Sequence, residues 1–264
     1  MIGIYFSGTG NTKYCLEKFV ALYDRNIEIT PLEDEGTIEK VAHHKDIIFA
    51  YPIYYSNLPK IVQDFICGNS DVWKGKHIFI IATMGLFSGD GAGVSARLFK
   101  RYGAHIWGGL HLKMPDCICD VKALKRTPDQ NKQIVIQAEE CIKSAVYNLK
   151  NGTPTKNGLG FWCHIAGLLG QRLWFYRKTQ AYSDKIQINS DTCIKCGKCA
   201  LVCPMNNLSL SKGKIVANGR CTLCYRCVNQ CSKKATILKY PGGQDRKELS
   251  KYRVSSQKTH LVSI

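Results

Sequence analysis

The sequence CIKCGKCALVCPMNNLSLSKGKIVANGRCTLCYRCVNQC, residues 193–231, contains eight cysteines in two runs. Each run has the spacing Cys-x-x-Cys-x-x-Cys-x-x-x-Cys, and each cysteine of the first run precedes its counterpart by 28 residues. The second run is therefore an internal duplicate of the first. The cysteines are Cys193, Cys196, Cys199, Cys203, Cys221, Cys224, Cys227 and Cys231.

This spacing predicts two 4Fe-4S clusters. Two-residue gaps let a tight loop present three sulfurs to one side, while the fourth lies on the following helix and ligates the cluster of the other run. We therefore expect one cluster on Cys193, Cys196, Cys199 and Cys231, and the second on Cys221, Cys224, Cys227 and Cys203. A pair of zinc sites is the alternative, but a third and fourth cysteine at these gaps have no role in a tetrahedral site.

Residues 186–240 resemble the bacterial two-cluster ferredoxins, in the cysteine runs and in residues such as Gly197 and Pro204. The resemblance implies a small α+β domain. Ser232 stands where that family usually has a second proline, and a hydroxyl beside a cluster thiolate can shift its potential through a hydrogen bond.

Residues 1–150 alternate between strand-like and helix-like segments. The expected strands are short and mostly apolar, as in a parallel sheet buried on both faces. They lie at residues 2–6, 27–30, 46–50, 77–83 and 105–112, and the expected helices at 12–23, 58–67, 92–102 and 128–149. This alternation predicts a doubly wound α/β domain.

The first strand-to-helix turn is Ser7-Gly8-Thr9-Gly10-Asn11-Thr12. Free N–H groups at a helix amino terminus, together with hydroxyls, bind a phosphate without any basic residue. The turn is neither a Walker motif, because it lacks the Gly-Lys-Ser/Thr ending, nor a dinucleotide fingerprint, because Lys13 replaces the third glycine. A phosphomonoester fits better.

This turn resembles the phosphate loop of the flavodoxins. The resemblance implies a five-stranded sheet and an FMN cofactor, with Ser7, Thr9, Asn11, Thr12 and the N–H groups of residues 8–12 around the phosphate. Two further loops lie where flavodoxins hold the flavin ring, and Gly89-Asp90-Gly91 resembles a turn of short flavodoxins. Their candidate FMN residues are Pro52, Ile53, Tyr54, Tyr55 and Asn57, and Thr83, Met84, Gly85 and Phe87.

Three further segments fall outside these resemblances. Residues 151–185 are expected to form an apolar helical linker, in which residues 158–176 pack between the domains, with an interfacial membrane helix as the alternative. Residues 241–264 are expected to be a basic, partly mobile tail. Cys117 and Cys119 are expected to be small buried residues rather than a redox pair.

Charge is unevenly distributed. Residues 1–150 carry 18 Lys and Arg against 16 Asp and Glu, whereas residues 151–264 carry 19 against 4. The basic half favours a redox partner with an acidic docking surface, contact with a membrane surface being less favoured. Nucleic acid is not expected, because no recognition module accompanies the charge. The cysteines and the absence of a signal peptide indicate the cytoplasm.

Taken whole, the chain resembles flavodoxin-ferredoxin fusion proteins of anaerobic bacteria. The resemblance implies an electron-transfer protein that relays electrons between FMN and two 4Fe-4S clusters and on to a partner. A flavin-dependent reductase of a quinone, nitro compound or disulfide, fed by its own clusters, is the alternative. A redox sensor is a third reading. No set of side chains has the pattern of a catalytic site.

Overall fold

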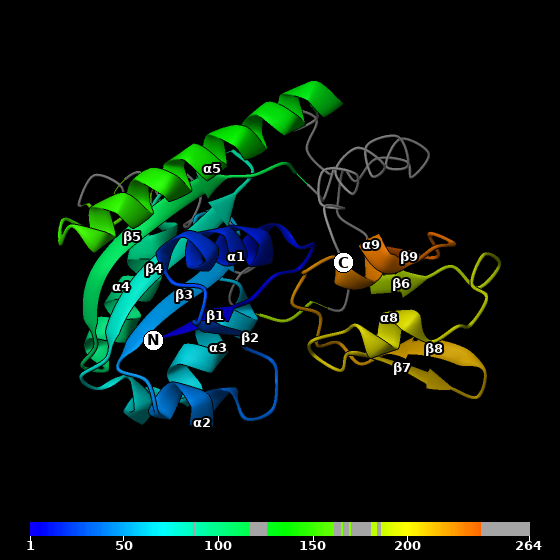
Figure 1. Ribbon diagram of the computed structural model, residues 1–264. Helices are drawn as coiled ribbons and strands as arrows, with labels where there is room; N and C mark the ends of the chain where they lie inside the picture. The colour runs from blue at the N-terminus through cyan, green and yellow to red at the C-terminus, as the bar shows by residue number, and fades with distance from the viewer. Residues whose placement is uncertain are drawn as a thin grey trace.

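The computed structural model describes residues 1–86, 88–116, 126–160, 165, 169, 181–183 and 186–238. These residues form a larger unit that ends near residue 160 and a smaller unit that begins near residue 181 (Figure 1). The expectations for Phe87, Cys117 and Cys119, residues 241–264 and most of residues 158–176 lie outside the described residues.

The larger unit is built on a five-stranded parallel sheet of order β2-β1-β3-β4-β5. The order reverses direction at β1, so the chain winds both ways from the first strand and confirms the doubly wound α/β prediction. The strands are β1 (Ile2–Tyr5), β2 (Glu28–Pro31), β3 (Asp46–Pro52), β4 (His77–Met84) and β5 (His105–Lys113).

Helices cover both faces of this sheet (Figure 1). On one face α1 (Asn11–Tyr23) packs against α5 (Pro128–Lys150), and on the other lie α3 (Lys60–Gly68) and α4 (Gly91–Arg101). Side chains of β3 alternate between the two apolar cores, as a strand buried on both sides requires. The α5 helix begins with a capping box between Thr127 and Gln130.

Two short elements were not expected from the sequence. One is α2 (Thr37–Ala42), and the other is the 3-10 helix η1 (Ser70–Trp73), which places the fully buried Trp73 in the core. Each has too few residues for a helical period to stand out from its surroundings. Each element is held by one apolar side chain in the core, Val41 in α2 and Trp73 in η1.

The smaller unit contains two short helices and two antiparallel strand pairs. The helices are α8 (Lys198–Leu201) and α9 (Arg226–Gln230), and the strands are β6 (Ile186–Ile188), β7 (Leu208–Ser211), β8 (Lys214–Ala217) and β9 (Thr236–Leu238). β6 pairs with β9, so both cysteine runs lie between these two strands, whereas β7 and β8 form a hairpin between the two runs. The expected small α+β domain is present.

The two units contact each other through polar and apolar side chains. Tyr182 donates a hydrogen bond to Asp64 of α3 at 2.5 Å, and Lys60 lies over the Tyr182 ring. Cys224 and Met205 of the smaller unit pack into the apolar core of the larger one. Among helices of the described residues, none is both long and apolar enough to cross a bilayer.

Candidate cofactor sites

An open cavity of about 100 Å³ lies at the carboxyl edge of the parallel sheet. This edge is where open α/β sheets bind ligands. The sequence-predicted residues that line it are Ser7, Gly8, Thr9, Asn11, Thr12, Pro52, Ile53, Tyr54, Thr83, Met84 and Gly85. Loops that are distant in sequence are thus brought to one site.

The turn between β1 and α1 presents backbone N–H groups to this cavity. The N-terminal flanking residue of α1, Gly10, has a φ of 105°, and no side chain caps the helix or places an acid in its first turn. Ser7 Oγ accepts a hydrogen bond from the Gly10 N–H at 3.1 Å. The amino terminus of this 13-residue helix therefore has neither a side-chain cap nor an acid near it, and its positive dipole end favours an anion, as in a phosphate loop.

Two side chains of the turn tie it to other loops of the cavity. The Thr12 and Thr83 hydroxyls form a buried hydrogen bond of 2.8 Å, and Asn11 donates its side-chain amide to the Pro115 carbonyl at 2.8 Å. Met114, Pro115 and Asp116 line the same cavity, although they were not among the candidate residues. They are placed there by parallel pairing that continues past β5, where the Met114 N–H donates to the Met84 carbonyl.

The loop after β3 closes on itself in a tight turn. Tyr54 and Asn57 exchange two backbone hydrogen bonds of 3.0 and 2.9 Å, with Tyr55 and Ser56 at positive φ between them. Tyr54 faces the cavity, whereas Tyr55 and Asn57, like Gly10, are not among its lining residues. Asn57 is buried, and its side-chain oxygen accepts from the Leu58 N–H at 2.9 Å, which indicates a role in shaping the loop.

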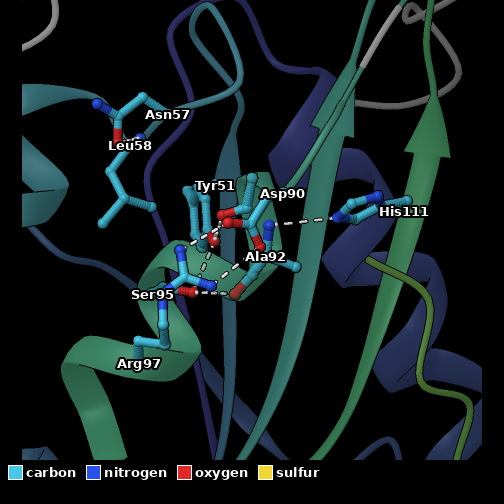
Figure 2. A network of polar contacts seen from close by, with 9 residues as sticks. Tyr51, Asn57, Leu58, Asp90, Ala92, Ser95, Arg97 and His111 are labelled. Atoms are coloured by element: carbon cyan, nitrogen blue, oxygen red, sulfur yellow. Dashed lines mark hydrogen bonds and ion pairs between the residues drawn. The ribbon is translucent and has the colours of Figure 1, made fainter. Parts of the chain in front are cut away.

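The loop after β4 is held by a buried polar network (Figure 2). The carboxylate of Asp90, only 1% exposed, accepts from the Arg97 guanidinium at 2.6 and 3.2 Å. Tyr51 donates its hydroxyl to the Gly91 carbonyl at 2.8 Å and meets Ser95 at 2.6 Å. A Cβ on Gly91 would lie 2.3 Å from Ile53, so this glycine lets the loops after β3 and β4 pack together.

The eight motif cysteines form two groups in space. A second, small cavity of about 20 Å³ is lined by Cys193, Cys196, Cys199 and Cys231, which we call the distal set. In the described part of the chain, no three Cys, His, Asp or Glu side chains are placed to hold a single metal ion. The four cysteines line one cavity, and their spacing along the chain is that of ligands to a 4Fe-4S cluster.

The remaining cysteines, Cys203, Cys221, Cys224 and Cys227, form the proximal set. Burial raises the pKa of Cys224 to about 12 and that of Cys227 further, and the charge of Cys203 adds to the increase at both. The charge of Cys231 acts in the same way on Cys199 of the distal set. Each fourth cysteine therefore lies with the opposite run, as the crossed ligation requires.

The duplication extends to the backbone around the sulfurs. Lys195 and Leu223, separated by the 28-residue repeat, both have positive φ and donate their N–H groups to Cys193 and Cys221 at 3.4 Å. In the same register, Asn207 and Ala235 donate to the fourth cysteines at 3.3 and 3.2 Å. Repeated N–H···S hydrogen bonds favour thiolates and tune cluster potential.

Comparison with known protein families gives two matches. Residues 2–102 match the flavodoxin domain model, and residues 185–208 match the model of a 4Fe-4S binding domain.

The chain combines a flavodoxin domain with a 4Fe-4S binding domain.

Several solved structures are similar to a little more than half of this chain. Two-electron reduced Megasphaera elsdenii flavodoxin is 22% identical, covers 56% of this chain and 99% of its own, and has a TM-score of 0.41. The Trp repressor binding protein of Bacillus subtilis is 20% identical, with 54% and 96% coverage and a TM-score of 0.41. Fusobacterium nucleatum flavodoxin bound to flavin mononucleotide is 10% identical, with 57% and 96% coverage and a TM-score of 0.40. No curated protein sequence matches the chain.

The flavodoxin domain implies FMN, and the cavity fits that group. The uncapped α1 terminus and the glycine-containing turn suit its phosphate, and the adjoining apolar walls from Ile53, Met84 and Met114 suit a flat ring. FMN here would exchange electrons singly or in pairs, whereas each iron-sulfur cluster would exchange one electron at a time.

The 4Fe-4S domain contributes a residue to the flavodoxin cavity. Cys224 of the proximal set lines that cavity together with Gly8 and Asp116. A Cβ on Gly8 would lie 2.2 Å from the Cys224 carbonyl oxygen, so the two domains touch there through backbone. Nothing in the sequence near Cys224 marks this contact, because its partners lie more than 100 residues away.

Arg226 joins the same two domains by its charge. Its guanidinium pairs with Glu33 at 2.5 Å and donates to the carbonyl of Ser7 at 3.0 Å. Both side chains of the ion pair are largely buried, 20% and 13% exposed. Burial alone would lower the pKa of Arg226, but the Glu33 carboxylate outweighs this and raises it. The Arg226 guanidinium therefore stays positively charged beside the proximal set.

Proposed function

We propose that this protein relays electrons between FMN and two 4Fe-4S clusters, and on to a redox partner. The observation that carries the proposal is the position of Cys224, which belongs to the proximal set and also lines the FMN cavity. A cluster ligated by this sulfur would lie against the flavin site, and electron transfer is favoured between cofactors held close together.

The positions of the two cysteine sets support an order for the relay. The proximal set is nearest the flavin, and its Cys221, Cys224 and Cys227 are only 6–8% exposed. The distal set surrounds its own cavity on the smaller unit, and its Cys196 is exposed. The proposed order is therefore flavin, proximal cluster, distal cluster.

The partner we propose is a redox protein with an acidic docking surface. Residues 186–238 contain eight Lys and Arg against the single acid Asp191, a charge balance that favours an acidic partner and a salt-sensitive encounter. The proposed compartment is the cytoplasm, since cluster thiolates need reducing conditions. All described cysteines are free of disulfides, which agrees with that setting.

The relay is tested with the full-length protein, loaded anaerobically with FMN, iron and sulfide. A flash-generated reductant injects less than one electron per molecule, and absorbance follows the flavin and cluster bands separately. We expect the electron to redistribute between flavin and clusters at a rate that does not depend on protein concentration. Redistribution that is absent, or that scales with protein concentration, contradicts an internal relay.

A charge-neutral variant serves as the control for cofactor content and for the redistribution rate. Gly160→Ala adds a methyl group where nothing lies within 4 Å, so FMN content, iron content and redistribution rate should all match the unmodified chain. A protein with intact clusters that takes up no FMN overturns the relay and leaves the 4Fe-4S assignment standing.

A further inference from the structure

We propose that the surface over the distal cysteine set is the port through which the protein exchanges electrons with its acidic partner. This inference rests on the proposed relay, and it adds the location of the port and the side chains that recognise the partner. The first observation is that the two cysteine sets differ in exposure.

The proximal set is closed off by the flavodoxin domain. Cys224 belongs to an apolar core cluster of the flavodoxin domain, and its carbonyl lies against Gly8. A docking protein has no direct approach to this side without separating the two domains. The proximal set is therefore placed for internal transfer.

The distal set opens outward. Its cavity is lined by Ile194, which is 58% exposed, and by the exposed Cys196. The neighbouring helix α8 ends at Leu201, which is 87% exposed. Apolar side chains at the centre of a surface with a charged rim are typical of protein docking sites.

Lysines supply that rim. Lys198 and Lys233 line the distal cavity, Lys195 lies between Ile194 and Cys196, and Lys234 follows Lys233. All four are exposed. The positive charge of these lysines would steer the carboxylates of a partner toward the distal cluster. The partner would then cover the apolar centre on contact.

The port is tested by reversing its charge. Lys195→Glu, Lys198→Glu and Lys233→Glu are combined in one variant, and Lys45→Glu, Lys74→Glu and Lys156→Glu in a control of equal net charge. The control lysines are exposed residues of the larger unit. The reduced, fully loaded protein is then oxidised by an anionic iron–EDTA complex, or by the cation hexaamminecobalt(III), at low and at high salt.

We expect the port variant to react about tenfold more slowly with the anion and faster with the cation at low salt, with both effects lost near 0.5 M salt. The control should change either rate by less than about twofold. Equal effects in the two variants, or none in the port variant, overturn the port.

A second measurement does not depend on turnover. An anionic dysprosium chelate speeds the spin relaxation of reduced clusters that it can approach, and we expect this enhancement to fall in the port variant only. Equal enhancement in both variants contradicts the port. If the flash experiment shows no internal redistribution but the dysprosium enhancement falls in the port variant only, the internal relay is wrong and the port stands. The two proposals can therefore fail separately.

Discussion

At the scale of single residues, the Arg226–Glu33 pair illustrates why burial matters more than distance. We expect Arg226→Met to lower the free energy of unfolding by about 3 kcal/mol, because it leaves the Glu33 carboxylate buried without its partner. Lys40→Met breaks a pair with Glu28 of similar length, 2.6 Å, but both groups are about half exposed, so about 0.5 kcal/mol is expected.

Urea unfolding of the loaded protein measures both changes. Adding Glu33→Gln to Arg226→Met should recover part of the loss, since the buried charge is then removed. Equal losses in Arg226→Met and Lys40→Met would show that the pair between the domains contributes no more than an exposed one.

His111 gives a pH dependence with a defined sign. Its Nε2 accepts from the Ala92 N–H at 3.2 Å (Figure 2), and burial lowers the pKa of the ring to about 4, against an opposing effect of Asp90. The unfolded chain binds a proton near pH 6.5, whereas the folded chain does not until about pH 4, so stability is lost as the pH falls through that window.

Between pH 7 and pH 5 this single ring should cost about 2 kcal/mol. We expect His111→Gln to remove that part of the pH dependence, measured as the difference in unfolding free energy at the two pH values. His43→Gln, at an exposed position, serves as the control and should retain it. Identical pH slopes for both variants would contradict the assignment.

At the scale of elements, the turn between β1 and α1 lines the cavity of the flavodoxin domain and also contacts the 4Fe-4S domain. We expect Gly8→Ala to push the Cys224 loop away, because a Cβ would lie 2.2 Å from its carbonyl oxygen. Amide hydrogen exchange of residues 222–226 should rise at least about tenfold, a local opening that leaves the sheet protected.

Gly68→Ala is the matched control, since nothing lies within 4 Å of its added Cβ. Unchanged exchange in Gly8→Ala would mean that the two domains are not held together at this turn.

The duplicated loops make a second prediction at this scale. We expect Cys203→Ser to weaken the proximal cluster, although Cys203 belongs to the first run, because it lies with Cys221, Cys224 and Cys227. Alkylation followed by mass spectrometry identifies which cysteines become reactive. Cys231→Ser is the mirror control and should release Cys193, Cys196 and Cys199. Release of the first-run cysteines by Cys203→Ser would refute crossed ligation.

At the scale of the whole molecule, the two domains pack against each other through apolar and polar side chains. They are not two independent bodies joined by a tether. Cys224 and Met205 pack in the core of the flavodoxin domain, Arg226 reaches Ser7, and Tyr182 reaches Asp64. Together these contacts present one cysteine set to the flavin site and the other to the surface. This asymmetry gives the proposed relay a direction in space.

Much of this molecule is encoded locally. Strand and helix bounds follow from apolar periodicity within short windows, and the predicted strands match the observed ones to within a few residues. The cysteine spacing predicts the loop geometry because each run folds around its own sulfurs. The turn of residues 7–12 lies at a helix amino terminus, as its local sequence predicts.

The sequence by itself therefore determined the two domain types and the kinds of cofactor that they imply. Only the tertiary structure decided which cysteine set faces the flavin, which residues join the domains, and that Met114, Pro115 and Asp116 complete the cavity. The physical reason is distance along the chain. Arg226 and Ser7 are 219 residues apart, and no local pattern specifies how two folded surfaces will complement each other.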